Sequence, residues 1–154
     1  SLASSTWDER ELASIQRVIE SGNYSMGNEV SKFEQEFAKF TGSKYCVMVN
    51  SGSSANLIMT AALFYRKENK LQPGDEVIVP AVSWPTTFYP LAQYGLKLKF
   101  VDIDKNTLNY DLNALKAAVS DKTRLIMVVN LLGNPNDFAQ INQKKEKKIM
   151  VRIP

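Results

Sequence analysis

The chain of 154 residues contains no histidine and only one cysteine, Cys46. Without histidine, these residues cannot build a Ser-His or Cys-His nucleophile or a histidine metal site. A single cysteine also excludes a disulfide within the chain and a multi-cysteine zinc site. Cys46 lies in an apolar run, so we expect it to be a small core residue. We therefore predict neither a metal centre nor a disulfide framework.

Long apolar runs and common nucleotide motifs are missing as well. No stretch approaches the roughly 20 apolar residues of a membrane-spanning helix, so we expect no membrane partner and a cytoplasmic location. The sequence has no GxGxxG and no Walker A pattern. Binding of a dinucleotide or a nucleoside triphosphate therefore finds little support.

Most of the chain carries little net charge. The net charge is +3, but residues 144–154 contribute +4, from four lysines and one arginine against one glutamate. Residues 1–143 therefore carry a net charge of −1. Nucleic-acid binding needs basic residues spread over a surface or groove, so we expect no nucleic-acid partner.

Helix and strand signals alternate along the chain. Two helices come first: Thr6 is predicted to cap the first, with Glu9 reaching back, and Gly22 and Gly42 end the two. Apolar runs then predict strands at 45–49, 76–79, 98–103 and 124–130, and helices at 54–66, 85–94, 111–119 and from 136, with Asp111 as the cap of the helix that ends near residue 119. This order predicts an α/β fold, a three-layer αβα arrangement with a largely parallel sheet.

A Gly/Ser-rich turn at residues 50–56 directly follows the first predicted strand and opens a predicted helix. Such a turn leaves backbone N–H groups unpaired at the positive end of the helix dipole, which suits a phosphate. The lack of a side chain at Gly52 would let a ligand approach the backbone closely. Helix capping by serine would explain the same residues without a ligand.

Two further loops follow predicted strands, and ligands bind at the carboxyl ends of parallel strands. Trp84 could stack its indole on an aromatic ring; packing against the sheet edge is the alternative. Asn130 could hydrogen-bond a ring substituent or a substrate hydroxyl; turn chemistry is the alternative. We expect these loops and the Gly/Ser turn to line one crevice. Asp102 and Asp104, at another strand end, are expected to cap or form a turn.

These segments resemble the DegT/DnrJ/EryC1/StrS family of sugar aminotransferases and related dehydratases over roughly residues 7–143. The matching segments are residues 21–27, 50–56, 73–80, 100–104 and 130–134. Residues 83–87 and 130–135 are most similar to the branch of nucleotide-activated 4-keto-6-deoxyhexose 3-dehydratases. The family uses pyridoxal 5'-phosphate (PLP) on the aspartate-aminotransferase fold. The resemblance therefore implies the N-terminal part of a PLP-transferase large domain.

The resemblance implies a role for four residues around the cofactor. Gly52 and Ser53 would bind the PLP phosphate through their backbone N–H groups and the Ser53 hydroxyl, and Ser54 would assist. Trp84 would stack on the pyridine ring. PLP acts as an electron sink, and the protein supplies orientation and electrostatics.

The resemblance also implies substrates and a partner subunit. A 3-dehydratase would remove the C3 hydroxyl of a nucleotide-activated keto-deoxysugar, with glutamate supplying the amino group of pyridoxamine 5'-phosphate (PMP). A sugar aminotransferase, which moves that amino group onto a keto-sugar, is the alternative. Both would serve the synthesis of surface polysaccharides such as lipopolysaccharide O-antigen. Tyr24 and Ser25, near the active site or the partner of a homodimer, and Asn130 are the substrate-side candidates.

The resemblance places the remaining catalytic groups beyond this sequence. They are an acid for the pyridine nitrogen and then a Schiff-base lysine or a histidine base, so we assign no catalytic residue here. We expect N-terminal helices and the active-site or dimer loop in 1–42, an incomplete PLP-binding large domain in 43–143 and a basic tail unlike the family in 144–154.

The tail leads to a hypothesis about the chain as a whole. We expect a truncated or frame-shifted fragment that is inactive alone, with the strand at 124–130 left unpaired at an exposed sheet edge. None of the tail lysines is expected to be the Schiff-base lysine; they are Lys144, Lys145, Lys147 and Lys148.

Overall fold

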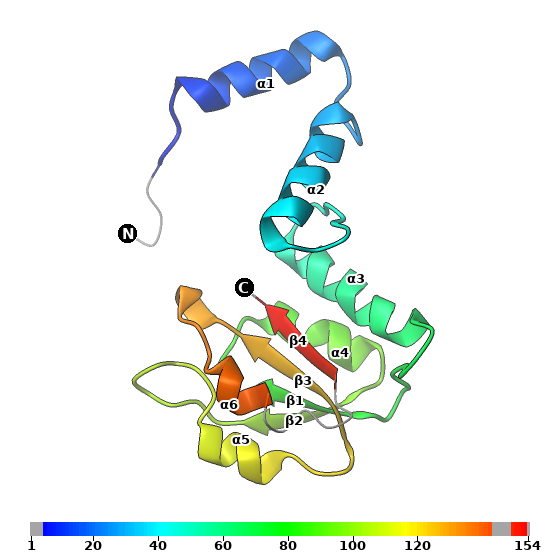
Figure 1. Ribbon diagram of the computed structural model, residues 1–154, viewed down its shortest axis with the longest axis vertical. Helices are drawn as coiled ribbons and strands as arrows, with labels where there is room; N and C mark the ends of the chain where they lie inside the picture. The colour runs from blue at the N-terminus through cyan, green and yellow to red at the C-terminus, as the bar shows by residue number, and fades with distance from the viewer. Residues whose placement is uncertain (1–4, 143–148, 154) are drawn as a thin grey trace. The chain divides into compact units, whose positions relative to one another are not determined.

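The computed structural model describes residues 5–142 and 149–153 (Figure 1). The chain divides into two compact units, Ser1–Val49 and Asn50–Pro154. The first unit contains helices α1 (Glu9–Ser21) and α2 (Asn28–Thr41). Both helices end as predicted, at glycines with positive φ, +64° for Gly22 and +69° for Gly42. Such a conformation is strained for residues with a side chain, which is why glycine ends both helices.

The cap of α1 lies two residues later than predicted. Asp8, not Thr6, accepts the backbone N–H of Arg10 at 2.8 Å, while the Glu11 carboxylate accepts the N–H of Asp8 at 2.7 Å. Asp8 and Glu11 have the same spacing as Thr6 and Glu9, so the sequence offers two capping boxes in succession. The predicted Thr6 cap was therefore wrong: the sequence contains two equivalent capping patterns, and the helix uses the second one.

The apolar faces of these two helices are largely exposed. No residue of α1 is buried, and in α2 only Ala38 is. The exposed apolar side chains of the two helices are Leu12, Ile15, Ile19, Phe33, Phe37 and Phe40. The 3.6-residue spacing predicted the helices correctly, although their apolar faces gain little burial from the residues described.

The run at residues 45–49 is not a strand, contrary to the prediction. Tyr45 and Val47 are 76% and 72% exposed, and Cys46 is half-buried rather than a core residue. The backbone N–H of Met48 is bonded to the Glu34 carboxylate at 2.8 Å. A strand forms only where a neighbouring strand pairs with its backbone, and none of the described strands pairs with this run.

The second unit is built on a four-stranded parallel sheet in the order β2-β1-β3-β4. The strands are β1 (Glu76–Pro80), β2 (Lys97–Val101), β3 (Thr123–Val129) and β4 (Ile149–Ile153). Strand β1 is central and almost fully buried, as its apolar, β-branched sequence predicts.

Strand β4 corrects the expectation for the end of the chain. It pairs with β3 over the full register from Leu125↔Ile149 to Val129↔Ile153, so β3 is not left at the sheet edge. The four lysines that precede this short run give residues 144–154 the character of a basic tail and mask its strand pattern in the sequence. Those lysines lie outside the described residues.

Helices cover both faces of this sheet, which confirms the predicted α/β architecture. They are α3 (Gly52–Tyr65), η1 (Pro85–Thr87), α4 (Tyr89–Gln93), α5 (Leu112–Ala118), η2 (Leu131–Gly133) and α6 (Phe138–Asn142). Alternate residues of a strand face opposite layers. Val77 and Met127 pack with α3 and α4, whereas Ile78 and Ile126 pack with α5 and α6.

The aspartates after β2 have the turn role that the sequence predicted. The Asp104 carboxylate accepts the backbone N–H groups of Asn106 and Thr107, both at 2.9 Å, and these bonds lower the pKa of Asp104. Asp102 accepts the N–H of Ile103 at 2.8 Å. In the part of the chain that is described, no helix has the length and apolar character that a membrane crossing needs.

Candidate functional site

One cavity lies where the polypeptide leaves two neighbouring strands of the second unit. It has a volume of about 520 Å³, and we call it the strand-end cavity. Its polar lining comes from α3, from the loop after β1 and from the residue after β3, and includes Gly52, Ser53, Asn56, Ser83, Trp84 and Asn130. The three loops therefore line one crevice, as the strand-end rule predicted.

The N-terminus of α3 offers free backbone donors to this cavity. Ser51 caps the helix, and its hydroxyl accepts the N–H of Ser54 at 3.2 Å. Within the described residues, the N–H groups of Gly52 and Ser53 have no acceptor, as expected for the first turn of a helix. The Ser54 hydroxyl is bonded to the Asn50 side chain at 2.6 Å, and Ser54 does not line this cavity.

Gly52 leaves space that the protein itself does not use. A Cβ atom at this position would meet nothing within 4 Å, and its backbone does not have a positive φ. Neither packing nor backbone conformation within the described chain therefore requires glycine here. The open face of Gly52 and the two free N–H groups fit a phosphate group that approaches the start of the helix.

The loop after β1 presents Trp84 to solvent. Its side chain is 73% exposed, so Trp84 is not packed against the sheet edge, which was the alternative to a ligand role. Two hydrogen bonds hold the loop. Asn56 of α3 donates its side-chain N–H to the Thr86 carbonyl at 3.2 Å, and the Ser83 and Thr87 hydroxyls, on either side of Trp84, are bonded at 3.0 Å. An exposed indole on a fixed loop can cover a flat ring.

Asn130 is tied to the chain that follows it. Its Oδ1 atom accepts the backbone N–H and the side-chain Nδ2 of Asn136, both at 3.1 Å. Asn136 is buried, and its Nδ2 also donates to the Val129 carbonyl at 2.7 Å. The turn chemistry considered for Asn130 is thus present, and Asn130 lines the cavity at the same time.

Sequence reasoning did not assign roles to Asn56 and Asn136. Each acts through another residue, Asn56 through the Trp84 loop and Asn136 through Asn130. Asn56 closes the Gly/Ser-rich segment, and Asn136 was predicted only as the start of a helix, so neither was predicted to support the site. The Asn56 contact spans 30 residues and comes from the tertiary fold, whereas the Asn136 contact spans 6 residues within the loop that follows β3.

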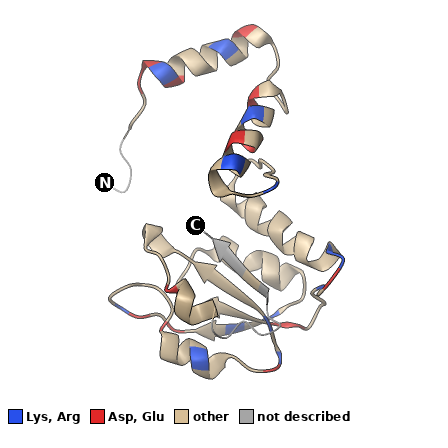
Figure 2. Cartoon of the chain, in the orientation of Figure 1, with Lys and Arg blue, Asp and Glu red and all other residues tan. Residues whose placement is uncertain are grey.

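No charged side chain lines the strand-end cavity, whose described lining consists of Gly, Ala, Ser, Thr, Asn, Trp, Val and Leu residues. Figure 2 shows the same property along α3, which carries neither acidic nor basic residues. An anion would therefore be held by neutral donors and by the positive end of the helix dipole. Elsewhere in the described chain, no cluster of three or more Cys, Asp or Glu residues could hold a metal ion.

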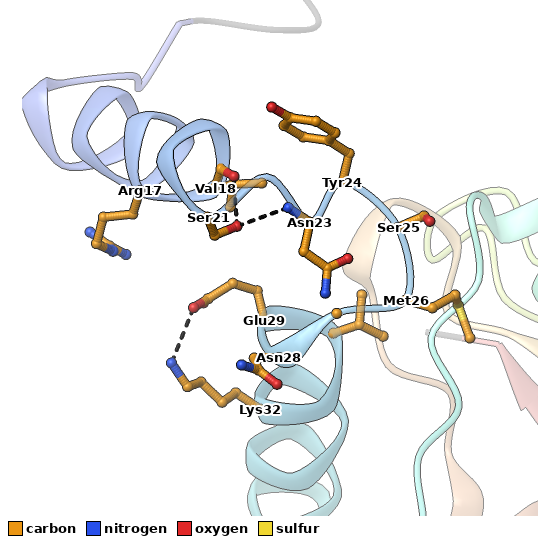
Figure 3. A pocket seen from close by; sticks show the side chains of 12 residues that line it. Arg17, Val18, Ser21, Asn23, Tyr24, Ser25, Met26, Asn28, Glu29 and Lys32 are labelled. Carbon is orange, nitrogen blue, oxygen red and sulfur yellow. Dashed lines mark hydrogen bonds and ion pairs between the residues drawn. The ribbon is translucent and has the colours of Figure 1, made fainter.

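Tyr24 and Ser25 line a different cavity, which belongs to the first unit (Figure 3). It has a volume of about 330 Å³ and includes Arg17 and Lys32, the latter paired with Glu29 at 3.1 Å. The loop around these residues is constrained. The next residue, Met26, has a φ of +50°, and a Cβ at Gly27 would lie 2.9 Å from the Asn23 amide.

Comparison with known proteins defines the class of protein. The sequence profile of the DegT/DnrJ/EryC1/StrS aminotransferase family matches residues 5–151, and the chain belongs to this family. The match extends into β4, beyond the residues over which the resemblance was recognised. This result confirms the predicted family and its α/β fold.

The particular relatives are sugar 3-dehydratases. The chain is 61% identical over 147 residues to GDP-4-keto-6-deoxy-D-mannose 3-dehydratase of Yersinia pseudotuberculosis, covering 96% of this chain and 37% of that enzyme. It is 61% identical over 142 residues to the same enzyme of Escherichia coli O55:H7, covering 92% of this chain and 37% of that one.

A solved structure extends the comparison to three dimensions. The E. coli GDP-4-keto-6-deoxy-D-mannose-3-dehydratase with bound hydrated PLP matches with a TM-score of 0.96 at 57% identity. The match covers 99% of this chain and 40% of that chain. Another solved form of such an enzyme contains bound GDP-perosamine. The present chain spans about two fifths of the length of these relatives.

Proposed function

We propose that this chain provides the phosphate- and ring-binding part of a PLP-dependent 3-dehydratase that acts on a nucleotide-activated 4-keto-6-deoxyhexose. One observation carries the proposal. Free N–H groups of Gly52 and Ser53, the exposed indole of Trp84 and the amide of Asn130 line one cavity. They do so in a chain that is 61% identical to GDP-4-keto-6-deoxy-D-mannose 3-dehydratases.

Residues in the cavity and at the start of α3 have defined tasks in this proposal. Gly52 and Ser53 hold the phosphate through backbone N–H groups, so the dipole of α3 stabilises its charge. Trp84 covers one face of the pyridine ring and excludes water from it. When bound, PLP supplies an electron sink that stabilises negative charge next to the reacting carbon. Ser54 supports the helix start through its bond to Asn50.

Glutamate, the nucleotide-sugar and a second subunit are further parts of the proposal. We propose that glutamate would donate its amino group to the cofactor and leave as 2-oxoglutarate, that Tyr24 and Ser25 contact the sugar nucleotide, and that the whole protein is a cytoplasmic homodimer. The constrained loop with Met26 at positive φ supports a binding role, because strained backbone is concentrated at functional sites. The 154 residues contain no histidine, so a histidine base would not come from them.

A sugar aminotransferase is the second candidate. The chain is 40% identical over 130 residues to UDP-2-acetamido-2-deoxy-3-oxo-D-glucuronate aminotransferase of Pseudomonas aeruginosa, covering 84% of this chain. Cofactor binding at the strand-end cavity would be the same in both reactions. The higher identity to the 3-dehydratases favours the first candidate.

The proposal is tested by titrating the chain with PMP and following the fluorescence of Trp84. A Trp7→Phe background makes Trp84 the sole indole, and PMP carries no aldehyde that could react with surface lysines. We expect saturable quenching. Pyridoxamine, which lacks the phosphate, serves as the matched ligand and is expected to bind far more weakly. A signal that PMP does not change would contradict cofactor binding by this chain.

Gly52→Ala then separates binding from folding. The added methyl group meets no protein atom within 4 Å, and alanine favours a helix over glycine by up to about 1 kcal/mol, so stability is expected to be kept or raised. The affinity for PMP is expected to fall about 10- to 100-fold, as when a hydrogen bond to a charged group is lost. The affinity for pyridoxamine should not change. Unchanged PMP affinity would place the phosphate elsewhere.

A further inference from the structure

The amide of Asn130 has a defined orientation in the free chain. The backbone N–H of Asn136 lies 3.1 Å from one terminal atom of this amide, and a backbone N–H can only donate. That terminal atom is therefore the oxygen, Oδ1. The Asn136 Nδ2 donates to the same atom at 3.1 Å, so Oδ1 accepts two hydrogen bonds. We call this arrangement the asparagine clasp.

Within the clasp, Asn136 is held more firmly than Asn130. Asn136 is only 6% exposed, whereas Asn130 is half-buried and lines the strand-end cavity. The second donor hydrogen of Asn136 Nδ2 is used by the Val129 carbonyl at 2.7 Å, at the end of β3. The side chain of Asn136 therefore cannot turn without losing two hydrogen bonds at a buried position, which is unfavourable.

We infer that Asn136 is a positioning residue that makes Asn130 a hydrogen-bond donor, and not an acceptor, toward the ligand of the strand-end cavity. Both lone pairs of Asn130 Oδ1 are used by Asn136, while Nδ2 of Asn130 has no acceptor among the described residues. A ligand atom that meets Asn130 must therefore accept a hydrogen bond. This inference rests on the proposed function, which makes a pyridoxyl cofactor the ligand; the acceptor is then an oxygen of that cofactor.

The polarity of the clasp can be measured without any ligand. In the isotope-labelled chain, we expect a scalar coupling through the hydrogen bond between the backbone nitrogen of Asn136 and the Cγ carbon of Asn130. A native spectrum that lacks this coupling would overturn the inference. This measurement remains decisive if PMP does not bind, so failure of the clasp and failure of the proposed function are distinguishable.

Two variants test whether the donor serves the ligand. Asn130→Asp keeps an oxygen for the clasp but offers no donor and adds negative charge, so the chain is expected to fold and to lose PMP affinity by more than about tenfold. Asn136→Ala removes the side-chain donor and leaves only the backbone N–H of residue 136 to hold Asn130 Oδ1, so it is expected to weaken PMP binding about three- to tenfold. In Asn136→Ala, the coupling between the backbone nitrogen of residue 136 and Cγ of Asn130 is expected to persist while the amide keeps its orientation and to be lost when the amide rotates.

A matched control separates a ligand role from the general effect of removing an asparagine. Asn113→Ala changes an exposed asparagine of α5 outside the cavity, and PMP affinity is expected to equal that of the unmodified chain. If Asn136→Ala does not fold, the PMP affinity of Asn130→Asp and the coupling in the unmodified chain still decide the question. Wild-type PMP affinity in a folded Asn130→Asp chain would overturn the donor role.

Discussion

The first unit, Ser1–Val49, and the second, Asn50–Pro154, use apolar residues in different ways. In the second unit, the strands carry side chains such as Val77, Ile78 and Leu125 with no exposed surface at all. In the first, helix residues with equally regular spacing, such as Leu12 and Phe40, are 62% and 86% exposed. Regularly placed apolar residues thus form a core in one unit and a surface in the other.

The difference shows that the spacing of apolar residues predicts a helix, but does not show which part of the protein packs against its apolar face. An amphipathic helix gains most of its stability from packing its apolar face. The second unit provides that packing within its own residues, through two clusters on the two faces of the sheet. In α1 and α2 the local signals of caps and glycines define the helix ends instead.

The largest contrast is expected from one substitution made in both units. Leu125→Ala removes a fully buried side chain of β3 and should lower the free energy of unfolding by about 2–5 kcal/mol. Leu12→Ala, on the exposed face of α1, should change it by less than about 0.5 kcal/mol. Urea denaturation followed by circular dichroism measures both. Equal losses would show that the two units do not differ in the way described.

Tyr110 should make the second unit sensitive to alkali. Its hydroxyl donates to the Met127 carbonyl at 2.7 Å, and burial raises the pKa of Tyr110 well above its usual value. The unfolded chain then loses this proton first, from about pH 10 upward. The folded chain binds more protons in that range, so stability falls as the pH rises.

Tyr110→Phe is the control for this pH dependence. It removes the titrating group and one buried hydrogen bond, so stability at neutral pH should fall by about 1–2 kcal/mol. The decline above pH 10 should become shallower than in the unmodified chain. Thermal unfolding at pH 8 and above pH 10 compares the two chains. Parallel pH profiles would mean that Tyr110 is not the source of the alkaline sensitivity.

The smallest expected effects come from the helix caps. Ser51→Ala removes the hydroxyl that accepts the Ser54 N–H at the start of α3, and should cost about 1 kcal/mol in the second unit. Asp8→Ala removes the cap of α1 and should lower helix content in the first unit only. Amide hydrogen exchange, read residue by residue, assigns each loss to its unit. Loss of protection in β3 after Asp8→Ala would contradict this separation.

The Asp8 cap also has a predicted pH dependence. Its hydrogen bonds with Arg10 lower the pKa of Asp8. A carboxyl with a lowered pKa stabilises its helix at pH values above its usual pKa, and this contribution is lost as the pH falls through the folded value. In the unmodified chain, circular dichroism should therefore show a loss of helix content as the pH falls. Asp8→Ala should show no such acid-dependent loss from this cap, because its α1 is already uncapped at neutral pH.

Local signals in the sequence predicted the elements whose stability is local. The glycines at 22 and 42 mark helix ends because only the adjacent turn decides their conformation, and Asp111 was recognised as the cap of α5 for the same reason. Strands β1 and β3 were predictable because short runs rich in Val and Ile suit a buried parallel sheet. The same rule failed at residues 45–49, where the run has no partner strand among the residues described.

The sequence predicted those parts of the candidate site that lie in loops directly after strands or predicted strands. Gly52, Trp84 and Asn130 line one cavity because parallel strands end at the same edge of a sheet. The contact of Asn56 with Thr86 was not predictable, since it joins α3 to a loop that only the fold brings near. The contact of Asn136 with Asn130 lies within one loop, and it depends on side-chain orientations that the sequence pattern does not specify. Strand β4 was missed because five apolar-rich residues were outweighed by the charged segment before them.

The uncharged lining of the strand-end cavity has a consequence for titration. None of the lining residues that the structure describes ionises between pH 5 and 9. The affinity of the cavity for a phosphate ester should therefore follow the ionisation of the ester itself, whose second pKa is about 6. The start of α3 would then distinguish the dianion from the monoanion by the number of charges presented to its dipole, without any acid or base of its own.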